Sequence, residues 1–97
     1  MTPITYLTIE RIFTTIADSF GLSVRGLIRS DNSIKYNKYR CLCSYMLWKQ
    51  ALISQKEAAD MLGITQSGIQ YHISLYRSEI KNDLVFSIKC EDIFDMF

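Results

Sequence analysis

Residues 53–73 read ISQKEAADMLGITQSGIQYHI and hold two short helical patterns separated by Gly63. Ser54 followed by Glu57 forms the capping box of a helix start, in which each side chain hydrogen-bonds the other residue's backbone N–H. We expect this helix to end just before Gly63, because glycine readily adopts the left-handed conformation that closes helices. Thr65 is then placed to cap a second helix. The stretch therefore predicts two helices joined by a tight turn.

The second helix is predicted to run from Gln66 to about Lys81 and to have two different faces. Its apolar positions recur at helical spacing and are Ile69, Ile73, Tyr76 and Ile80. On the opposite side lie Ser67, Gln70, Tyr71, Ser74 and Ser78. A helix that only faces solvent tends to carry Lys and Glu, which are strong helix formers. The short, uncharged hydrogen-bonding groups found here suit the edges of DNA bases.

The spacing around the turn indicates a helix-turn-helix. Ala58 and Ala59 are small enough to let two helices approach closely, and in this unit the start of the second helix meets base edges in the major groove. The positions concerned are Thr65, Gln66, Ser67, Gln70 and Tyr71. The two glutamines suit bidentate contacts to adenine, whereas the hydroxyls are at least as well suited to phosphates. The alternative is a pair of capped helices that only fills a core.

The chain before this unit predicts two more helices. Apolar residues at steps of three and four within residues 9–20, with Thr8 as N-cap and Gly21 as stop, indicate an amphipathic first helix. Residues 23–33 suit a short helical turn followed by a polar surface loop. A longer helix over about residues 35–52 is apolar on most sides, which is typical of a central helix.

After Asn82 the pattern changes. Leu84, Phe86 and Ile88 alternate with Val85, Ser87 and Lys89, and this alternation predicts a short strand. Residues 91–97 suit a last helical turn. A lone strand needs a partner, and both irregular packing and pairing with another chain remain open. The expected fold class is therefore all-α: a compact multi-helix bundle containing a helix-turn-helix, with a short extended C-terminal tail.

Length and composition fit one domain over residues 1–97, with its core at about 5–82 and the tail at 83–97. The 97 residues are 48% hydrophobic and 22% charged, with a net charge of +1. Charge is unevenly placed, since residues 21–57 carry seven Lys or Arg against two acids, whereas residues 82–97 carry one Lys against four acids. The basic middle permits nucleic-acid binding, and the apolar, acidic end permits protein binding.

Other classes of function find little support. No apolar run reaches the roughly 20 residues of a membrane span, and we expect a cytoplasmic protein with reduced cysteines. Cys41 and Cys43 diverge by about 200° on a helix and cannot chelate one metal. His72 is expected to be a packed or phosphate-facing group. No nucleophile with a companion base and no phosphate-binding loop is visible, so we expect no metal, no cofactor and no enzyme activity.

A wider resemblance covers roughly residues 9–80. The residues that carry it are Ile12, Ile16, Ala17, Phe20, Gly21, Val24, Leu27, Arg40 and Tyr45. In their spacing the chain resembles the C-terminal duplex-DNA-binding domain of the bacterial replication initiator DnaA. The resemblance implies an all-α scaffold with a helix-turn-helix and a duplex-binding mode. It places Arg40 before the central helix and Tyr45 within it.

The chain also departs from that family. Asn32 and Ile34 stand where the family's basic loop places two arginines that reach the minor groove, with Lys35 and Lys38 as partial substitutes. At the recognition helix the family's Arg-Asp-His and Ser/Thr-Thr-Val pattern is replaced by residues 65–69, TQSGI, about one residue shorter. The base-reading chemistry therefore differs, so neither the family's target site nor its initiator activity is transferred.

The sequence as a whole predicts sequence-selective binding of double-stranded DNA, in replication or transcription control. The residues expected at the DNA are Thr65, Gln66, Ser67, Gln70, Tyr71 and Ser74 on the reading face and Lys35, Lys38, Arg40 and Lys56 at the backbone. The competing hypothesis is a protein-interaction or homodimerisation module that uses residues 84–97.

Overall fold

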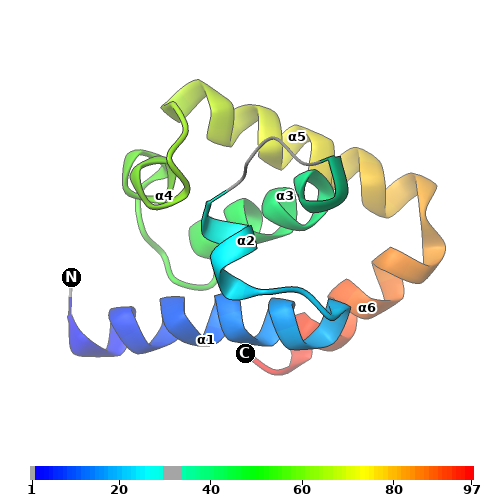
Figure 1. The fold of residues 1–97 in the computed structure, drawn as a ribbon, viewed down its shortest axis with the longest axis horizontal. Coiled ribbons are helices and arrows are strands. Elements are labelled where there is room, and N and C mark those ends of the chain that lie inside the picture. Colours follow the sequence, from blue (N-terminus) through cyan, green and yellow to red (C-terminus); the bar gives the residue numbers. More distant parts are fainter. Residues whose placement is uncertain (1, 30–33) are drawn as a thin grey trace.

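The computed structural model describes residues 2–29 and 34–97, except for the side chains of residues 34 and 35. Within these ranges the chain forms six helices and no strand (Figure 1). They are α1 (Pro3–Phe20), α2 (Val24–Ile28), α3 (Ile34–Lys49), α4 (Gln55–Leu62), α5 (Gln66–Asn82) and α6 (Leu84–Asp95). The predicted all-α multi-helix bundle is confirmed. Most of the loop expected over residues 29–33 lies outside the described residues.

Helix α3 is the centre of the bundle. It packs against α1, α2, α4 and α5. Its buried apolar residues are Cys41, Leu42, Cys43, Met46 and Leu47. A helix that buries several sides needs neighbours on several sides, so the prediction of a central helix is confirmed. The helix ends at Lys49 rather than near Leu52, whose left-handed φ of 56° cannot continue a helix and whose side chain is 81% exposed.

Helix α1 begins earlier than the sequence indicated. Its N-cap is Thr2, whose hydroxyl accepts the N–H of Thr5 at 3.1 Å, and Pro3 occupies the first turn, where a missing N–H does no harm. The expected cap, Thr8, lies inside the helix and donates its hydroxyl to the carbonyl of Ile4 at 2.9 Å. The predicted end is confirmed, because Gly21 closes the helix with a φ of 65°.

The two-helix unit predicted from residues 53–73 is confirmed in its local details. The hydroxyl of Ser54 accepts the N–H of Glu57 at 3.1 Å, and the Glu57 carboxylate accepts the N–H of Ser54 at 3.2 Å. Gly63 ends α4 with a φ of 66°, and the hydroxyl of Thr65 caps α5 by accepting the N–H of Gly68 at 3.1 Å. Only residues 63–65 separate α4 from α5.

The extended tail predicted after Asn82 is wrong, because those residues form helix α6. Asp83 both ends α5 and begins α6, its carboxylate accepting the N–H of Phe86 at 3.0 Å. Phe86, Cys90 and Ile93 are buried at steps of four and three, which is the period of a helix. The apparent alternation spans only residues 84–88, too short a stretch to exclude a helix.

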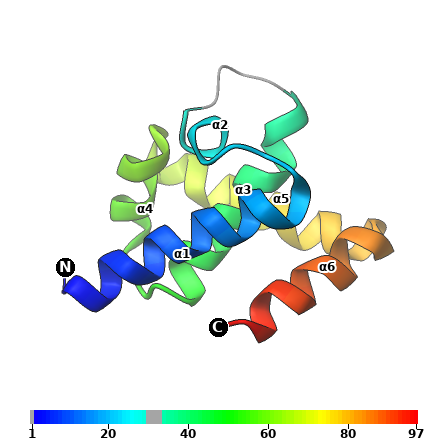
Figure 2. The ribbon, with the colours of Figure 1, turned by 60° about the horizontal axis from the view of Figure 1, so that its bottom comes forward.

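Helix α6 turns back from α5 and lies along α1 (Figure 2). Aromatic rings hold it in place. Tyr45 of α3 stacks on Tyr76 of α5 with ring centroids 4.4 Å apart, and Phe94 of α6 meets the Tyr45 ring edge-on at 5.7 Å. Phe86 reaches Phe20 of α1 at 5.8 Å. The final helix therefore completes the core and leaves the start of α5 uncovered (Figure 1).

Candidate nucleic-acid interface

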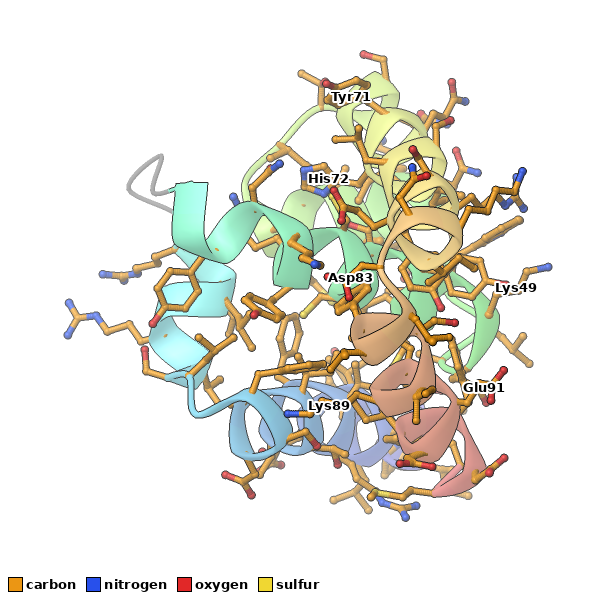
Figure 3. All side chains as sticks on the ribbon, turned by 90° about the vertical axis from the view of Figure 1, so that its right-hand side faces the viewer. Lys49, Tyr71, His72, Asp83, Lys89 and Glu91 are labelled. Atoms are coloured by element: carbon orange, nitrogen blue, oxygen red, sulfur yellow. The ribbon has the colours of Figure 1, made fainter. Side chains whose placement is uncertain are left out.

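The start of α5 presents a continuous polar surface to solvent. Its apolar side, formed by Ile69, Ile73 and Tyr76, is buried against the bundle. The residues that are exposed are Thr65, Gln66, Ser67, Gln70, Tyr71, Ser74 and Ser78. Tyr71 is 63% exposed and projects away from the bundle at the end of the molecule that α5 forms (Figure 3). We call the set of Gln66, Ser67, Gln70, Tyr71 and Ser74 the α5 outer face.

The polar side chains at the start of α5 differ in whether they already form hydrogen bonds within the protein. Thr65 is occupied, since its hydroxyl caps the helix and also lies 3.1 Å from the Ser67 hydroxyl. The amides of Gln66 and Gln70 make no hydrogen bond with any described residue. An exposed amide in water keeps both a donor and an acceptor available, which is the pair of groups that an adenine edge requires.

Of the four predicted backbone contacts, Lys56 is exposed at the start of α4. The side chain of Lys35 lies outside the described part of the structure. The other two residues, Lys38 and Arg40, have different roles from those expected.

Lys38 is held inside the protein's own charge network. Its ammonium pairs with Glu79 at 3.4 Å and with Asp83, and it lies 4.6 Å from the centre of the Phe86 ring. Partial burial alone would lower the pKa of Lys38, but the two carboxylates outweigh it and the pKa is raised. Lys38 thus ties α3 to the junction of α5 and α6, and its charge is already paired with two carboxylates.

Arg40 is buried, with 7% of its surface exposed. Its Nε donates to the carbonyl of Leu27 at 3.0 Å, and its Nη2 donates to the carbonyl of Leu62. These carbonyls belong to the last turns of α2 and α4, where helix carbonyls lack partners of their own. Arg40 therefore joins three helices from within, and only 7% of its surface is left for the expected contact with phosphate. Burial lowers the pKa of its guanidinium.

His72 lies directly behind the exposed surface of α5 and is also buried. Its Nδ1 lies 2.8 Å from the hydroxyl of Ser44 on α3. Burial lowers the pKa of His72, and the positive charge of Arg40 lowers it further. Of the two roles expected for this histidine, the structure shows the packed one.

Arg77 is a residue that reasoning from the sequence missed. It is exposed on α5 and its guanidinium carbon lies 6.0 Å from the centre of the Trp48 ring on α3. Lys49 lies over the same ring at 4.2 Å. The sequence position of Arg77 could have indicated it. Arg77 follows Gln70 by seven residues, about two helical turns, and therefore lies on nearly the same side of the helix. Its partnership with Trp48 was not visible, since the two residues are far apart in the chain.

The three cysteines lie in the core of the bundle. Cys41, Cys43 and Cys90 are all buried as free thiols, and burial raises the pKa of Cys41 and of Cys90 to about 12. Within residues 2–29 and 34–97 no group of His, Cys, Asp and Glu could hold a metal ion. Among the helices of these same segments, none has the length and apolar character needed to cross a membrane.

A groove between α1, α2 and α4 has a volume of about 630 Å³. Its walls are mainly apolar, with Ile9, Phe13 and Ile28 among them, and Glu10 is the one carboxylate in its lining.

In comparisons with known proteins, no protein-family model, no curated protein and no solved structure matches the chain.

Proposed function

We propose that this protein binds double-stranded DNA by placing the start of α5 in the major groove. The observation that carries the proposal is the α5 outer face, which is exposed, polar and free of charged side chains. Ordinary solvent-facing helices gain nothing from such a surface, whereas a helix that reads base edges needs short donors and acceptors. A helix about 10–12 Å in diameter fits a groove about 12 Å wide.

The roles of the individual side chains follow from their chemistry. Gln66 and Gln70 are the candidates for bidentate contacts to adenine, each contributing about 1–3 kcal/mol of discrimination. Ser67 and Ser74 are small enough to let the helix approach the groove. Tyr71 suits contact with a thymine methyl group or with the backbone. Thr65 supports the interface indirectly, because its hydroxyl is used as the helix cap.

Phosphate contact on the α4 side is assigned to Lys56, and Lys35 keeps the role that its sequence position indicates. The scaffold is proposed to be of the DnaA C-terminal type, with replication or transcription control in the cytoplasm as the setting. The resemblance placed Arg40 before the central helix, whereas Arg40 lies within α3, and its burial supports a structural role for this position.

The decisive experiment selects binding sites from random duplexes and then measures affinity for the selected duplex by fluorescence anisotropy. Gln70→Ala is expected to weaken binding to the selected duplex by about 1–3 kcal/mol and to relax the preference for one base pair. Asn82→Ala is the matched control, because it removes an exposed amide about 18 Å farther along the same helix. Failure to enrich any sequence would refute selective reading by the α5 outer face.

A second candidate function, protein binding or homodimerisation through residues 84–97, is favoured by the outer side of α6. Leu84, Val85 and Ile88 are 73%, 68% and 50% exposed. Three neighbouring apolar side chains in water are a common feature of contact surfaces between proteins. The acids that follow them, Glu91 and Asp92, are exposed as well and would form a charged rim.

A further inference from the structure

Beside α5 the structure brings two cations to one aromatic ring. The ammonium of Lys49 lies 4.2 Å from the centre of the Trp48 indole, and the guanidinium carbon of Arg77 lies 6.0 Å from it. Lys49 is the last residue of α3, whereas Arg77 lies in the second half of α5. Tyr45 meets the indole edge-on at 6.2 Å, which helps to set the direction of the ring. The packing of α3 on α5 therefore creates this cluster.

The two cations of the cluster form no ion pair with a described residue, although Glu91 lines the same groove as Arg77. In the described part of the chain neither Lys49 nor Arg77 has a carboxylate at ion-pair distance. Lys38 provides the contrast, because its ammonium also lies over an aromatic ring but is neutralised by Glu79 and Asp83. A ring face attracts a cation by only about 0.5–1 kcal/mol at an exposed site. An anion bound by the N–H donors of these side chains would stabilise the like charges further.

The position of the cluster suits the backbone of a duplex. Arg77 follows Gln70 by about 10 Å along α5 and lies on nearly the same side of the helix. The major groove is about 12 Å wide, so a helix that holds Gln70 at base edges brings the residue two turns later close to a bordering strand. Figure 3 shows Lys49 beside α5, below Tyr71, whereas Lys89 lies toward α1.

We propose that Lys49 and Arg77, oriented by Trp48, bind a phosphodiester group of one DNA strand while the α5 outer face reads the bases. This inference rests on the proposed duplex binding and adds to it a backbone contact on the α3 side. The aromatic face limits the motion of two long side chains before DNA arrives, which lowers the entropy lost on binding. A contact to phosphate contributes equally to all sequences and is weakened by salt.

The test measures affinity by fluorescence anisotropy at several salt concentrations, on the selected duplex and on a scrambled one. Arg77→Ala and Lys49→Ala are each expected to weaken binding about three- to tenfold on both duplexes and to reduce the salt slope by about 0.9. Arg77→Lys should retain the salt slope, because the slope depends on the number of charges at the phosphates and this change keeps the charge. Lys89→Ala is the matched control, since it removes the same charge and a cation over the Phe20 ring at 5.3 Å.

The outcomes separate this inference from the proposed function. Salt slopes of Arg77→Ala and Lys49→Ala equal to that of Lys89→Ala would overturn the phosphate contact and leave duplex binding in place. An Arg77→Lys protein with the reduced salt slope of Arg77→Ala would also overturn it, because the contact would then not depend on charge. Absence of salt-sensitive binding by the unaltered protein would reject the proposed function and this inference together. All variants are compared at equal thermal stability, which exposed positions such as Arg77 should preserve.

Discussion

Ser44 of α3 and His72 of α5 meet inside the bundle, with the serine Oγ 2.8 Å from the imidazole Nδ1. The same hydroxyl lies 3.1 Å from the carbonyl of Arg40, to which it donates. With its single hydrogen directed at this carbonyl, the serine oxygen is able to accept a hydrogen bond from a protonated Nδ1 of His72. Burial and the charge of Arg40 lower the pKa of His72 and so favour its neutral form, directly behind the residues proposed to read DNA. This buried contact links α5 to α3.

The protein should lose stability as the medium becomes mildly acidic. In the unfolded chain His72 takes up a proton at about pH 6.5, whereas burial and the charge of Arg40 lower its pKa in the fold. The unfolded state then binds more protons, so the free energy of unfolding falls as pH drops through about 6.5 toward the folded pKa. Urea unfolding between about pH 7.5 and pH 5 measures this change.

His72 is the one histidine in the sequence, so a His72→Gln protein should lose the dependence of stability on pH in this range. Identical pH profiles for the two proteins would exclude His72 as its source.

Replacing Arg40 should destabilise the fold. Arg40→Met removes the donors to the carbonyls of Leu27 and Leu62 while it keeps much of the apolar volume. Hydrogen bonds to a charged group contribute about 1.5–3 kcal/mol each, and we expect a loss of at least about 2 kcal/mol in the free energy of unfolding. Thermal unfolding followed by circular dichroism measures the effect. Arg29→Met is the control, because this exposed arginine should change stability by less than about 0.5 kcal/mol. Equal midpoints for the two variants would contradict the structural role of Arg40.

The turn between α4 and α5 should tolerate only residues that adopt a left-handed backbone. An added Cβ at Gly63 would meet nothing within 4 Å, so the cost of Gly63→Ala comes from its φ of 66° alone. That cost is about 1 kcal/mol, or a fall of about 4–8 °C in the unfolding midpoint for a domain of this size. Gly63→Asn should cost less, since asparagine enters this region more readily. An alanine variant as stable as the unaltered protein would mean that the turn relaxes to another conformation.

The outer side of α6 gives the competing function its own test. If two copies of the chain associate through α6, Ile88→Lys should lower the mass measured by analytical ultracentrifugation to that of a monomer. The same change should leave the unfolding midpoint nearly unaltered, because Ile88 is half exposed in the single chain. Ile93→Lys is the contrast and should unfold the protein, since Ile93 is buried. A mass that does not respond to Ile88→Lys would remove α6 as the contact between copies.

Reasoning from the sequence succeeded where the deciding interactions are local. The capping box of Ser54 and Glu57, the left-handed turn at Gly63 and the cap at Thr65 each involve residues within four positions of one another. The two faces of α5 follow from helical period alone. The same reasoning failed at residues 84–88, because five residues did not distinguish a strand from a helix whose buried side continues to Cys90 and Ile93.

The environment of each charged residue could not be predicted from the sequence. Arg40, Lys38 and Arg77 are equally basic in the sequence, yet Arg40 binds helix carbonyls, Lys38 is neutralised by two acids and Arg77 stays exposed beside Trp48. The sequence by itself determined the helices of the two-helix unit and which side of α5 is polar, since hydrogen bonds and side-chain direction within a helix depend on near neighbours. Only the tertiary structure decided which cations remain available to a ligand, because burial and charge pairing depend on residues brought together from distant parts of the chain.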